Sequence, residues 1–465
     1  MYKRFERIHL IGIGGSGMSG IAEVLKNIGY EVTGSDIKET ETTMRLRTLG
    51  IGITIGHEAE NIGHADVVVV SSAISDDNPE VIEAKKRAIP VIPRAEMLAE
   101  LGRLKYGVLI AGAHGKTTTT SIIASIMSSA RLDPTVIIGG KLKGMGSNAK
   151  LGSGDFLVAE ADESDGSFLK LTPTISVVTN IDREHMDFFK DINQLKEAFL
   201  TFINKVPFYG IAIVCGDDRY IKGLMPYIQR RFITYGLSEG LNLVARNIKT
   251  EGARTMFDAF FNDEYLGNFD IPLIGEHNVY NSLAAIGVAK ELEIDMDIVR
   301  DSLRDFSGVH RRFETKAVVK GIRVIDDYGH HPTEIRATLR AARQVMSQIS
   351  DDNKGRLIVL FQPHRYTRTR DLLSEFYDAF VDADMVILMD IYPAGEMPIN
   401  GIDSGLLAKG IRESGKMVEY IKDRGEVINY LINNLKGGDT LITLGAGDVW
   451  RMGEEFIKLK VANRG

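Results

Sequence analysis

Short apolar runs alternate with segments of helical length along most of the chain. Continuous apolar runs of about four to eight residues are typical of strands buried on both faces of a parallel sheet, and the segments between them then form crossover helices. The pattern therefore predicts an α/β protein. The expected strands are residues 7–13, 31–35, 67–70, 89–92, 106–110, 156–161, 175–181, 211–214, 322–326, 357–361, 385–389 and 441–444.

The same pattern divides the chain into three domains. A length of 465 residues is too great for one hydrophobic core, because domains usually contain about 100 to 200 residues. We expect a doubly wound domain over residues 1–104, a central domain over residues 105–312 and a second doubly wound domain over residues 313–465. In the central domain, short alternating segments between residues 241 and 274 predict a small antiparallel sheet beside a mostly parallel one.

Composition excludes several classes of protein. Hydrophobic residues make up 44% and charged residues 26%, as in soluble globular proteins. No apolar run approaches the roughly 18 residues of a membrane span, and a net charge of −7 without a long basic cluster does not favour nucleic-acid binding. Cys215 is the only cysteine, so no disulfide can form within the chain. We expect a cytoplasmic protein whose partners include neither membrane nor nucleic acid.

A glycine loop after the run at residues 106–110 carries the most informative chemistry. It reads Ala-Gly-Ala-His-Gly-Lys-Thr-Thr over residues 111–118, and a helix-like segment follows over residues 121–130. Backbone N–H groups of such a loop surround phosphates, while Lys116 supplies a charge and the Thr117 hydroxyl can bind Mg²⁺. The general pattern has a further glycine where this chain has Ile110. The ATP-binding residues predicted from the loop are Gly112, Ala113, His114, Gly115, Lys116, Thr117 and Thr118.

A second glycine loop lies near the N-terminus. Gly-Ile-Gly-Gly-Ser-Gly spans residues 12–17 between a predicted strand and helix, and Asp36 follows at the end of the next strand. This spacing is the dinucleotide fingerprint, in which glycines let the backbone approach a pyrophosphate. Because the same loop binds any diphosphate, the sequence leaves open a dinucleotide or a nucleotide-sugar.

Two acidic stretches follow buried strands of the central domain. One is Glu-Ala-Asp-Glu-Ser-Asp at residues 160–165, where strand alternation would place Glu160 and Asp162 on one face. The other surrounds His185 within residues 181–187. Crowded carboxylates repel one another unless a cation joins them, and their oxygen ligands suit Mg²⁺. The alternative is a solvated acidic loop.

Two polar stretches follow strands of the last domain. Residues 326–332 contain Asp-Asp-Tyr-Gly-His-His-Pro, and residues 361–370 contain His364, Arg365 and Arg368. Arginines suit carboxylate or phosphate recognition, and histidines titrate near neutrality. The alternatives are a solvated basic turn and residues that cap the helix after Pro332.

Together these motifs resemble the Mur ligase family of bacterial peptidoglycan synthesis over essentially the whole chain. The family's phosphate loop also lacks the early glycine. The resemblance implies a Rossmann-like N-terminal domain, a central P-loop ATPase domain and a Rossmann-like C-terminal domain. The motifs that carry it are residues 12–20, 34–36, 114–120, 160–165, 275–281, 308–314 and 326–332.

The resemblance implies an ATP-dependent ligase that joins L-alanine to the carboxylate of UDP-N-acetylmuramate through an acyl phosphate. Lys116, Glu160, His185 and His330 would be catalytic, and Thr117, Glu160 and His185 would bind Mg²⁺, of which two ions are expected. Asn278, Arg312 and Asp327 would complete the ATP site. The substrate-binding residues would be Gly14, Gly15, Ser16, Gly17, Asp36 and Ser71 for the UDP-sugar, and Tyr328, Arg365 and Arg368 for the amino acid. The chain would act as a monomer or homodimer.

The residues themselves leave three alternative functions open. A related recycling ligase would attach a tripeptide to the same sugar nucleotide. A dehydrogenase using the first glycine loop for NAD would leave Lys116 and Glu160 unexplained. A binding protein that senses UDP-sugars without catalysis would need a defective ATP site, yet the sequence keeps Lys116, Thr117, Glu160 and His185.

Overall fold

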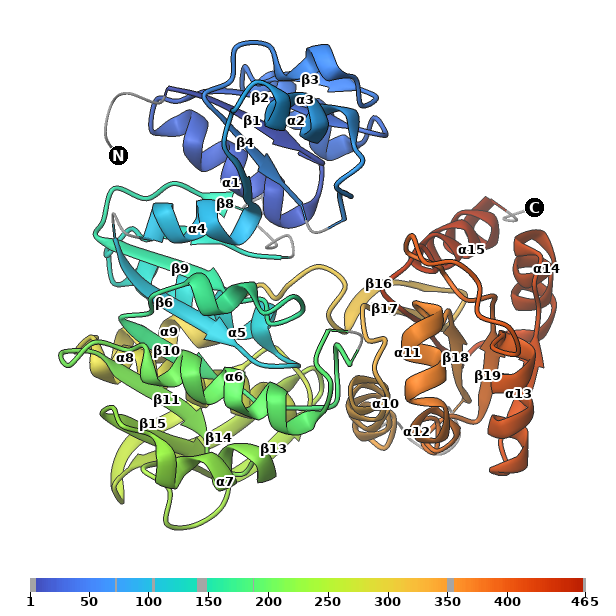
Figure 1. Ribbon diagram of the computed structural model, residues 1–465. Coiled ribbons are helices and arrows are strands. Elements are labelled where there is room, and N and C mark those ends of the chain that lie inside the picture. Colours follow the sequence, from blue (N-terminus) through green and yellow to red (C-terminus); the bar gives the residue numbers. More distant parts are fainter. Residues whose placement is uncertain are drawn as a thin grey trace. The chain divides into compact units, whose positions relative to one another are not determined.

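The computed structural model describes residues 6–71, 73–102, 105–139, 149–186, 188–348 and 355–462. Its strands form three sheets (Figure 1). The first is parallel and has the order β3-β2-β1-β4-β5. Its strands are β1 (Arg7–Ile11), β2 (Glu31–Asp36), β3 (Gly52–Ile55), β4 (Val67–Val70) and β5 (Val91–Pro93), and its helices are α1 (Ser16–Asn27), α2 (Glu41–Thr48), the 3₁₀ turn η1 (Ala59–Ile62), α3 (Pro79–Lys86) and α4 (Arg94–Gly102).

The strand order of the first sheet locates its ligand site. The chain moves from β1 to β2 on one side and later returns to β4 on the other side. Ligands of open α/β sheets bind at such a switch point, outside the carboxyl ends of the strands. The loop after β1 holds Gly14 and Gly15, Ser16 and Gly17 begin α1, and the loop after β4 begins with Ser71, so both predicted segments lie at this edge.

The central sheet has ten strands in the order β15-β14-β13-β12-β11-β10-β6-β9-β7-β8. Pairing is parallel from β7 and β9 through β6, β10, β11 and β12 to β13, whereas β7 and β8 are antiparallel. The strands expected between residues 241 and 274 are present and continue the edge of this sheet. The strands are β6 (Tyr106–Ala111), β7 (Thr135–Ile137), β8 (Ala149–Lys150), β9 (Phe156–Glu160), β10 (Ile175–Val178), β11 (Ile211–Cys215), β12 (Phe232–Gly236), β13 (Leu243–Glu251), β14 (Arg254–Phe261) and β15 (Glu264–Ile271).

Helices connect the central strands and follow the sheet. Phe168 packs against Phe199 and Phe202 of one of these helices, with ring centroids 5.3 and 5.2 Å apart. The helices are α5 (Lys116–Ser129), η2 (Ser167–Lys170), α6 (Ile192–Asn204), α7 (Arg219–Leu224), η3 (Met225–Tyr227), α8 (Glu276–Glu291) and α9 (Met296–Arg304).

The third sheet has six strands in the order β16-β17-β21-β18-β19-β20, and only the pair β16 and β17 is antiparallel. Its strands are β16 (Glu314–Val319), β17 (Ile322–Asp327), β18 (Leu357–Phe361), β19 (Met385–Leu388), β20 (Met417–Tyr420) and β21 (Thr440–Leu444). Its helices are α10 (Pro332–Met346), α11 (Tyr366–Asp371), α12 (Leu373–Tyr377), α13 (Ser404–Glu413), α14 (Arg424–Asn434) and α15 (Trp450–Ala462).

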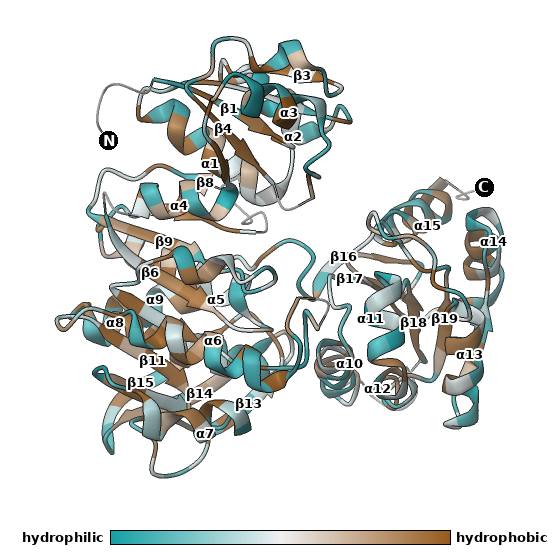
Figure 2. Ribbon diagram, viewed as in Figure 1, coloured by the Kyte–Doolittle hydropathy of each residue, from teal (hydrophilic) through white to brown (hydrophobic). Residues whose placement is uncertain are grey.

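Alternate strand residues of the third sheet enter two separate hydrophobic clusters. Val359 packs in the cluster with α10, α12 and α13, whereas Ile358 packs in the cluster with α14 and α15. Both faces of the sheet are therefore covered, which explains why its strands are continuous apolar runs. In Figure 2 the strands are largely hydrophobic, whereas the helices also carry hydrophilic residues.

Contacts divide the chain into two compact units. One comprises residues 1–246, 258–269 and 280–308, and the other comprises residues 247–257, 270–279 and 309–465. The boundary expected at residue 104 lies outside the described residues. Among the helices that the structure describes, none has the length and apolar character needed to cross a membrane.

Candidate active site

The phosphate loop follows β6, which lies between β10 and β9. Gly112 has a φ of +137° and Gly115 a φ of +83°, so the backbone adopts conformations that other residues rarely reach. An added Cβ at Gly115 would also lie 2.5 Å from Oδ1 of Asn281. Lys116 then begins α5, so the loop leads directly into a helix N-terminus, as phosphate binding requires.

Residues after β10 hold the phosphate loop in place. The N–H of His114 donates to Oδ1 of Asn180 at 2.8 Å, and the His114 carbonyl accepts from Nδ2 of Asn180 and Oγ1 of Thr179. The His114 ring lies 2.9 Å from a carboxylate oxygen of Asp182. Side chains of Thr179, Asn180 and Asp182 therefore all hold His114 of the loop.

Lys116 is held between the loop and an acidic side chain. Its Nζ donates to the Gly112 carbonyl at 2.5 Å and lies 2.9 Å from both carboxylate oxygens of Glu163. Burial lowers the pKa of Lys116, but the carboxylates of Glu163, Asp162 and Glu184 outweigh this effect and raise the pKa above its ordinary value. The ammonium therefore stays charged beside the loop.

Glu163, Glu184 and His185 form an acidic cluster around this lysine. One ligand atom of each lies within 4.8 Å of the others. His185 has a φ of +57°, and its Nε2 is 3.8 Å from Glu184 and 4.0 Å from Glu163. Two carboxylates and an imidazole are donors suited to a divalent cation, and the carboxylate oxygens suit Mg²⁺. Glu163 and Glu184 were not singled out from sequence, although both belong to the acidic stretches identified there.

Glu160 and Asp162 have different partners. Glu160 ends β9, and its Oε1 accepts the N–H of Gly139 at 2.8 Å. The strand ends there, so the alternation expected to place both acids on one face does not reach Asp162. Asp162 instead pairs with Nη2 of Arg94 at 3.2 Å. Among the described residues, Glu160 is not a member of the cluster around His185.

The remaining loop residues belong to α5. Thr118 is buried, and the Thr117 carbonyl accepts the hydroxyl of Ser121 at 2.6 Å. Neither contact uses the Thr117 hydroxyl, which stays a predicted Mg²⁺ ligand.

The first glycine loop is tied to the end of β2. The N–H groups of Gly12 and Ile13 donate to the Ser35 carbonyl at 2.9 and 3.0 Å. The N–H of Gly14 donates to a carboxylate oxygen of Asp36 at 2.8 Å. Asp36 thus supports the loop in which the predicted diphosphate site begins.

Gly15, Gly17 and Ser71 lie around the same loop. Gly15 precedes α1 and its N–H donates to the Gly12 carbonyl at 3.2 Å, while Ser16 begins the helix. An added Cβ at Gly17 would lie 2.8 Å from Nη1 of Arg94. An added Cβ at Gly12 would lie 3.4 Å from the Ser71 Cβ. Arg94 was not predicted from sequence, because its position beside the predicted diphosphate loop is visible only in the fold.

In the C-terminal unit, Asp327 is buried at the end of β17. Its carboxylate accepts the N–H of Phe313 at 2.7 Å and of Gly329 at 2.8 Å. Burial raises its pKa from 3.8 to about 6, although the nearby Arg312 guanidinium opposes the shift. Arg312 itself lies 3.4 Å from Glu334.

Asn278 lies in α8, and its Nδ2 donates to the Ile274 carbonyl at 2.8 Å. Burial lowers the pKa of the adjacent His277 to about 4, so that ring is neutral at physiological pH.

Tyr328, His330 and His364 form a chain of ring contacts that ends on Tyr392. The ring centroids are 5.5, 5.8 and 5.5 Å apart, and His364 stacks on Tyr392. His330 Nδ1 lies 3.1 Å from the Tyr328 carbonyl. Because a carbonyl only accepts, Nδ1 carries the proton and Nε2 is the basic nitrogen of the neutral ring.

Arg365 and Arg368 lie next to this chain. Arg365 has a φ of +72°, which is rare for a residue with a side chain, and its N–H donates to the Tyr392 carbonyl at 2.9 Å. Nη1 of Arg368 is 3.3 Å from Nδ1 of His364. The structure therefore brings together Tyr328, His330 and both arginines through His364. His331 caps α10, because its Nδ1 accepts the N–H of Thr333. Capping of this helix is one of the alternatives that the sequence leaves open for the stretch at residues 326–332.

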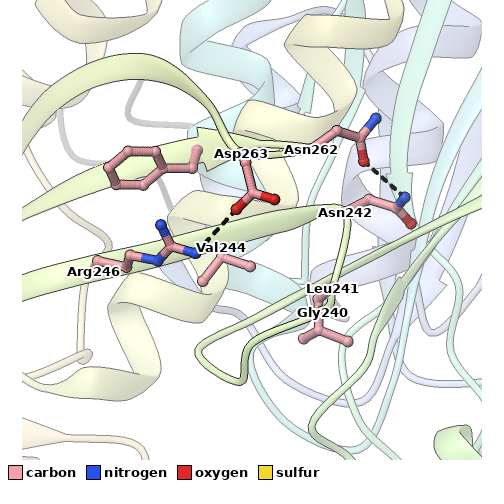
Figure 3. A pocket seen from close by; sticks show the side chains of 8 residues that line it. Gly240, Leu241, Asn242, Val244, Arg246, Asn262 and Asp263 are labelled. Atoms are coloured by element: carbon pink, nitrogen blue, oxygen red, sulfur yellow. Dashed lines mark hydrogen bonds and ion pairs between the residues drawn. The ribbon is translucent and has the colours of Figure 1, made fainter.

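A cavity of about 220 Å³ lies along β13 and β14, outside the predicted sites (Figure 3). Arg246 and Asp263 pair across it at 3.1 Å, and Asn242 binds Asn262 at 3.0 Å. Both contacts are polar, and the side chains that make them pair with one another.

Three family models match successive parts of the chain. They describe the Mur ligase family catalytic domain over residues 7–106, the Mur ligase middle domain over residues 110–289 and the Mur ligase glutamate ligase domain over residues 311–447. The chain belongs to the Mur ligase family. The resemblance identified from the motifs is thereby confirmed, as is the three-domain α/β fold of this family.

Full-length relatives agree with this assignment. The UDP-N-acetylmuramate–L-alanine ligase of Geotalea uraniireducens is 55% identical over 462 residues, which cover 99% of both chains. The ligase of the same name from Geobacter sulfurreducens is 53% identical over 467 residues and covers all of both chains. The crystal structure of UDP-N-acetylmuramate-alanine ligase MurC from Thermotoga maritima has a TM-score of 0.83 at 28% identity, covering 98% of this chain and 100% of that one.

Proposed function

We propose that this Mur ligase joins L-alanine to the carboxylate of UDP-N-acetylmuramate, with ATP converted to ADP and phosphate, in peptidoglycan synthesis. Relatives that match over their full length carry this name at 53% and 55% identity. The observation that carries the proposal is the site around Lys116, where a phosphate loop, a charged ammonium and an acidic cluster meet. We place the reaction in the cytoplasm, where ATP is available.

The three sheets would divide the substrates among them. Residues 1–104 would bind the UDP-sugar at Gly14, Gly15, Ser16, Gly17, Asp36 and Ser71. Residues 105–312 would bind ATP at Gly112 to Thr118, with Asn278 at the adenine and Arg312 at the phosphates. Residues 313–465 would bind the amino acid, with Asp327 directed to the ATP ribose.

The first chemical step is activation of a carboxylate, which does not form an amide in water unaided. The muramoyl carboxylate attacks the γ-phosphorus of ATP, the bond to the bridging oxygen breaks, and an acyl phosphate and ADP result. Lys116 would lie against the β- and γ-phosphate oxygens and reduce repulsion between the two anions. Thr117, Glu160 and His185 would hold Mg²⁺, which would neutralise further charge on the transferring group. Glu163 and Glu184, which among the described residues form a cluster with His185 but not with Glu160, would supply further carboxylate ligands.

The second step is attack by the amine of L-alanine on the acyl carbon, with loss of phosphate. Arg365 and Arg368 would pair with the carboxylate of the amino acid. An ammonium has no lone pair, so it must first lose a proton. Nε2 of His330 would accept it, since Nδ1 is committed to the Tyr328 carbonyl.

The test is phosphate release from ATP and Mg²⁺ with UDP-N-acetylmuramate and different acceptors. We expect release that requires both the sugar nucleotide and L-alanine, with glycine and L-serine weaker. Release only with the stem tripeptide would assign the recycling activity instead. Absence of phosphate release with every acceptor would indicate that the protein binds UDP-sugars without catalysis.

A further inference from the structure

A buried carboxylate lies beneath the first glycine loop and takes no part in the reaction described above. Glu80 of α3 has no exposed surface. Its Oε2 accepts the Ser35 hydroxyl at 2.8 Å and lies 2.8 Å from Nε2 of His9. Its Oε1 lies 2.9 Å from Nδ1 of His57 and 3.1 Å from Nδ2 of Asn61. One side chain thus joins β1, β2, the segment after β3 and α3.

The ionisation of this carboxylate follows from its donors. Burial acts to raise the pKa of Glu80, but the hydrogen bonds from His9, Asn61, Ser35 and His57 outweigh burial and lower the pKa overall. The titratable side chains that face Glu80 are His9 and His57. A charge buried among directed donors fixes their positions strongly, because losing any donor leaves it poorly solvated.

Ser35 connects this carboxylate to the loop. Its hydroxyl binds Glu80, and its carbonyl accepts the N–H groups of Gly12 and Ile13. The next residue, Asp36, accepts the N–H of Gly14. Movement of Ser35 would therefore be transmitted to three consecutive loop residues.

We propose that Glu80 is a positioning residue for the UDP-sugar, holding the end of β2 through Ser35 so that the loop and the start of α1 keep the position in which they receive the diphosphate. The inference rests on the proposed role of this loop as the UDP-sugar site. It assigns Glu80 no contact with substrate. His57 and Asn61 hold the carboxylate from the opposite side, and His9 holds it from β1.

The test compares two hydroxyl deletions on one strand. Ser35→Ala removes the link between Glu80 and the loop. Thr33→Val is the matched control, because among the described residues the Thr33 hydroxyl lies 2.8 Å from Nδ1 of His9 and does not bond to Glu80 or the loop. Titration calorimetry with UDP-N-acetylmuramate, without ATP, should show about tenfold weaker binding by Ser35→Ala. For Thr33→Val the change should stay within about twofold, although both variants melt at lower temperature.

Glu80→Gln provides a second measurement through steady-state kinetics. An amide keeps the shape but places a donor against the donors of Ser35 or Asn61, so the KM for the UDP-sugar should rise at least about tenfold. The KM for ATP should stay within about twofold, because the phosphate loop of the central sheet is untouched. Equal effects of Ser35→Ala and Thr33→Val on affinity would overturn the inference, as would an unchanged UDP-sugar KM in folded Glu80→Gln. Failure of the unmodified protein to bind the UDP-sugar would instead contradict the proposed function.

Discussion

At the scale of a residue, the contacts of Lys116 hold its positive charge at the phosphate loop. Its ammonium contacts the Gly112 carbonyl and the Glu163 carboxylate. We expect Lys116→Ala and Glu160→Ala each to lower turnover by at least about a hundredfold. The first variant removes a positive charge from beside the transferring phosphoryl group, and the second removes a proposed ligand of the Mg²⁺ that would neutralise the same group. UDP-sugar affinity should remain, and Lys150→Ala serves as a control because its ion pair with Asp133 lies outside the site. Loss of UDP-sugar binding in a folded variant would contradict the division of substrates among the domains.

Asp327 gives a residue-scale prediction about pH. Its pKa of about 6 in the folded chain exceeds the ordinary 3.8, so the folded state binds more protons between these values and loses stability as pH rises through them. The difference corresponds to at most about 3 kcal/mol of unfolding free energy. As pH rises from about 4 to about 6, Asp327→Asn should therefore become more stable relative to the parent.

Asp439 is the control for this pH effect, because its pKa is shifted in the opposite direction. Burial acts to raise the pKa of Asp439, but bonds from Arg356 outweigh it and lower that pKa, so its stabilisation is lost as pH falls. Asp439→Asn should lose stability relative to the parent as pH rises. Calorimetric melting at several pH values measures both trends, and parallel behaviour of the two variants would refute the account.

At the scale of an element, the turn into α5 depends on Gly115. Alanine there would carry a φ of +83° and place a Cβ 2.5 Å from Asn281, so Gly115→Ala should destabilise the fold by about 1–3 kcal/mol. Displacement of the loop should also raise the KM for ATP at least about tenfold. Gly223→Ala is the matched control: Gly223 lies in α7 with open space around its Cα, so alanine should be neutral or stabilise by up to about 1 kcal/mol. Equal ATP KM values for the two variants would show that the loop tolerates a side chain.

At the scale of the whole molecule, the residues proposed for the UDP-sugar and those proposed for the amino acid lie in different compact units. Phe380 is fully buried in the C-terminal unit, where its ring lies 5.2 Å from that of Phe361. Phe380→Ala should destabilise that unit by about 3–5 kcal/mol and leave UDP-sugar affinity within about twofold. Phe208→Ala, which removes a ring that is 92% exposed, should change melting little. A large loss of UDP-sugar affinity in folded Phe380→Ala would show that the units are strongly coupled.

Local signals predicted the elements well wherever apolar runs were continuous. The strands β4 and β18 have the expected limits. Some strands end one to three residues before the expected limit, namely β1, β9, β10 and β19, and others end one residue after it, namely β2, β5, β6, β11 and β17. α5 begins at Lys116 rather than near residue 121, since four threonines hid the start of a helix that tertiary packing buries. The strands after β12 were expected as a small sheet, and their pairing with the central sheet is a property of the tertiary structure.

The sequence by itself determined the fold class, the family and the two glycine loops, because each of these depends on residues close together in the chain. Only the tertiary structure decided which acids meet Lys116. Glu163 and Glu184 come from loops after different strands, and sheet order brings them within reach. The same holds for Arg94 beside Gly17 and for Glu80 beneath Ser35. Such long-range contacts depend on strand order and on the length of each connection, which local patterns of hydrophobicity do not specify.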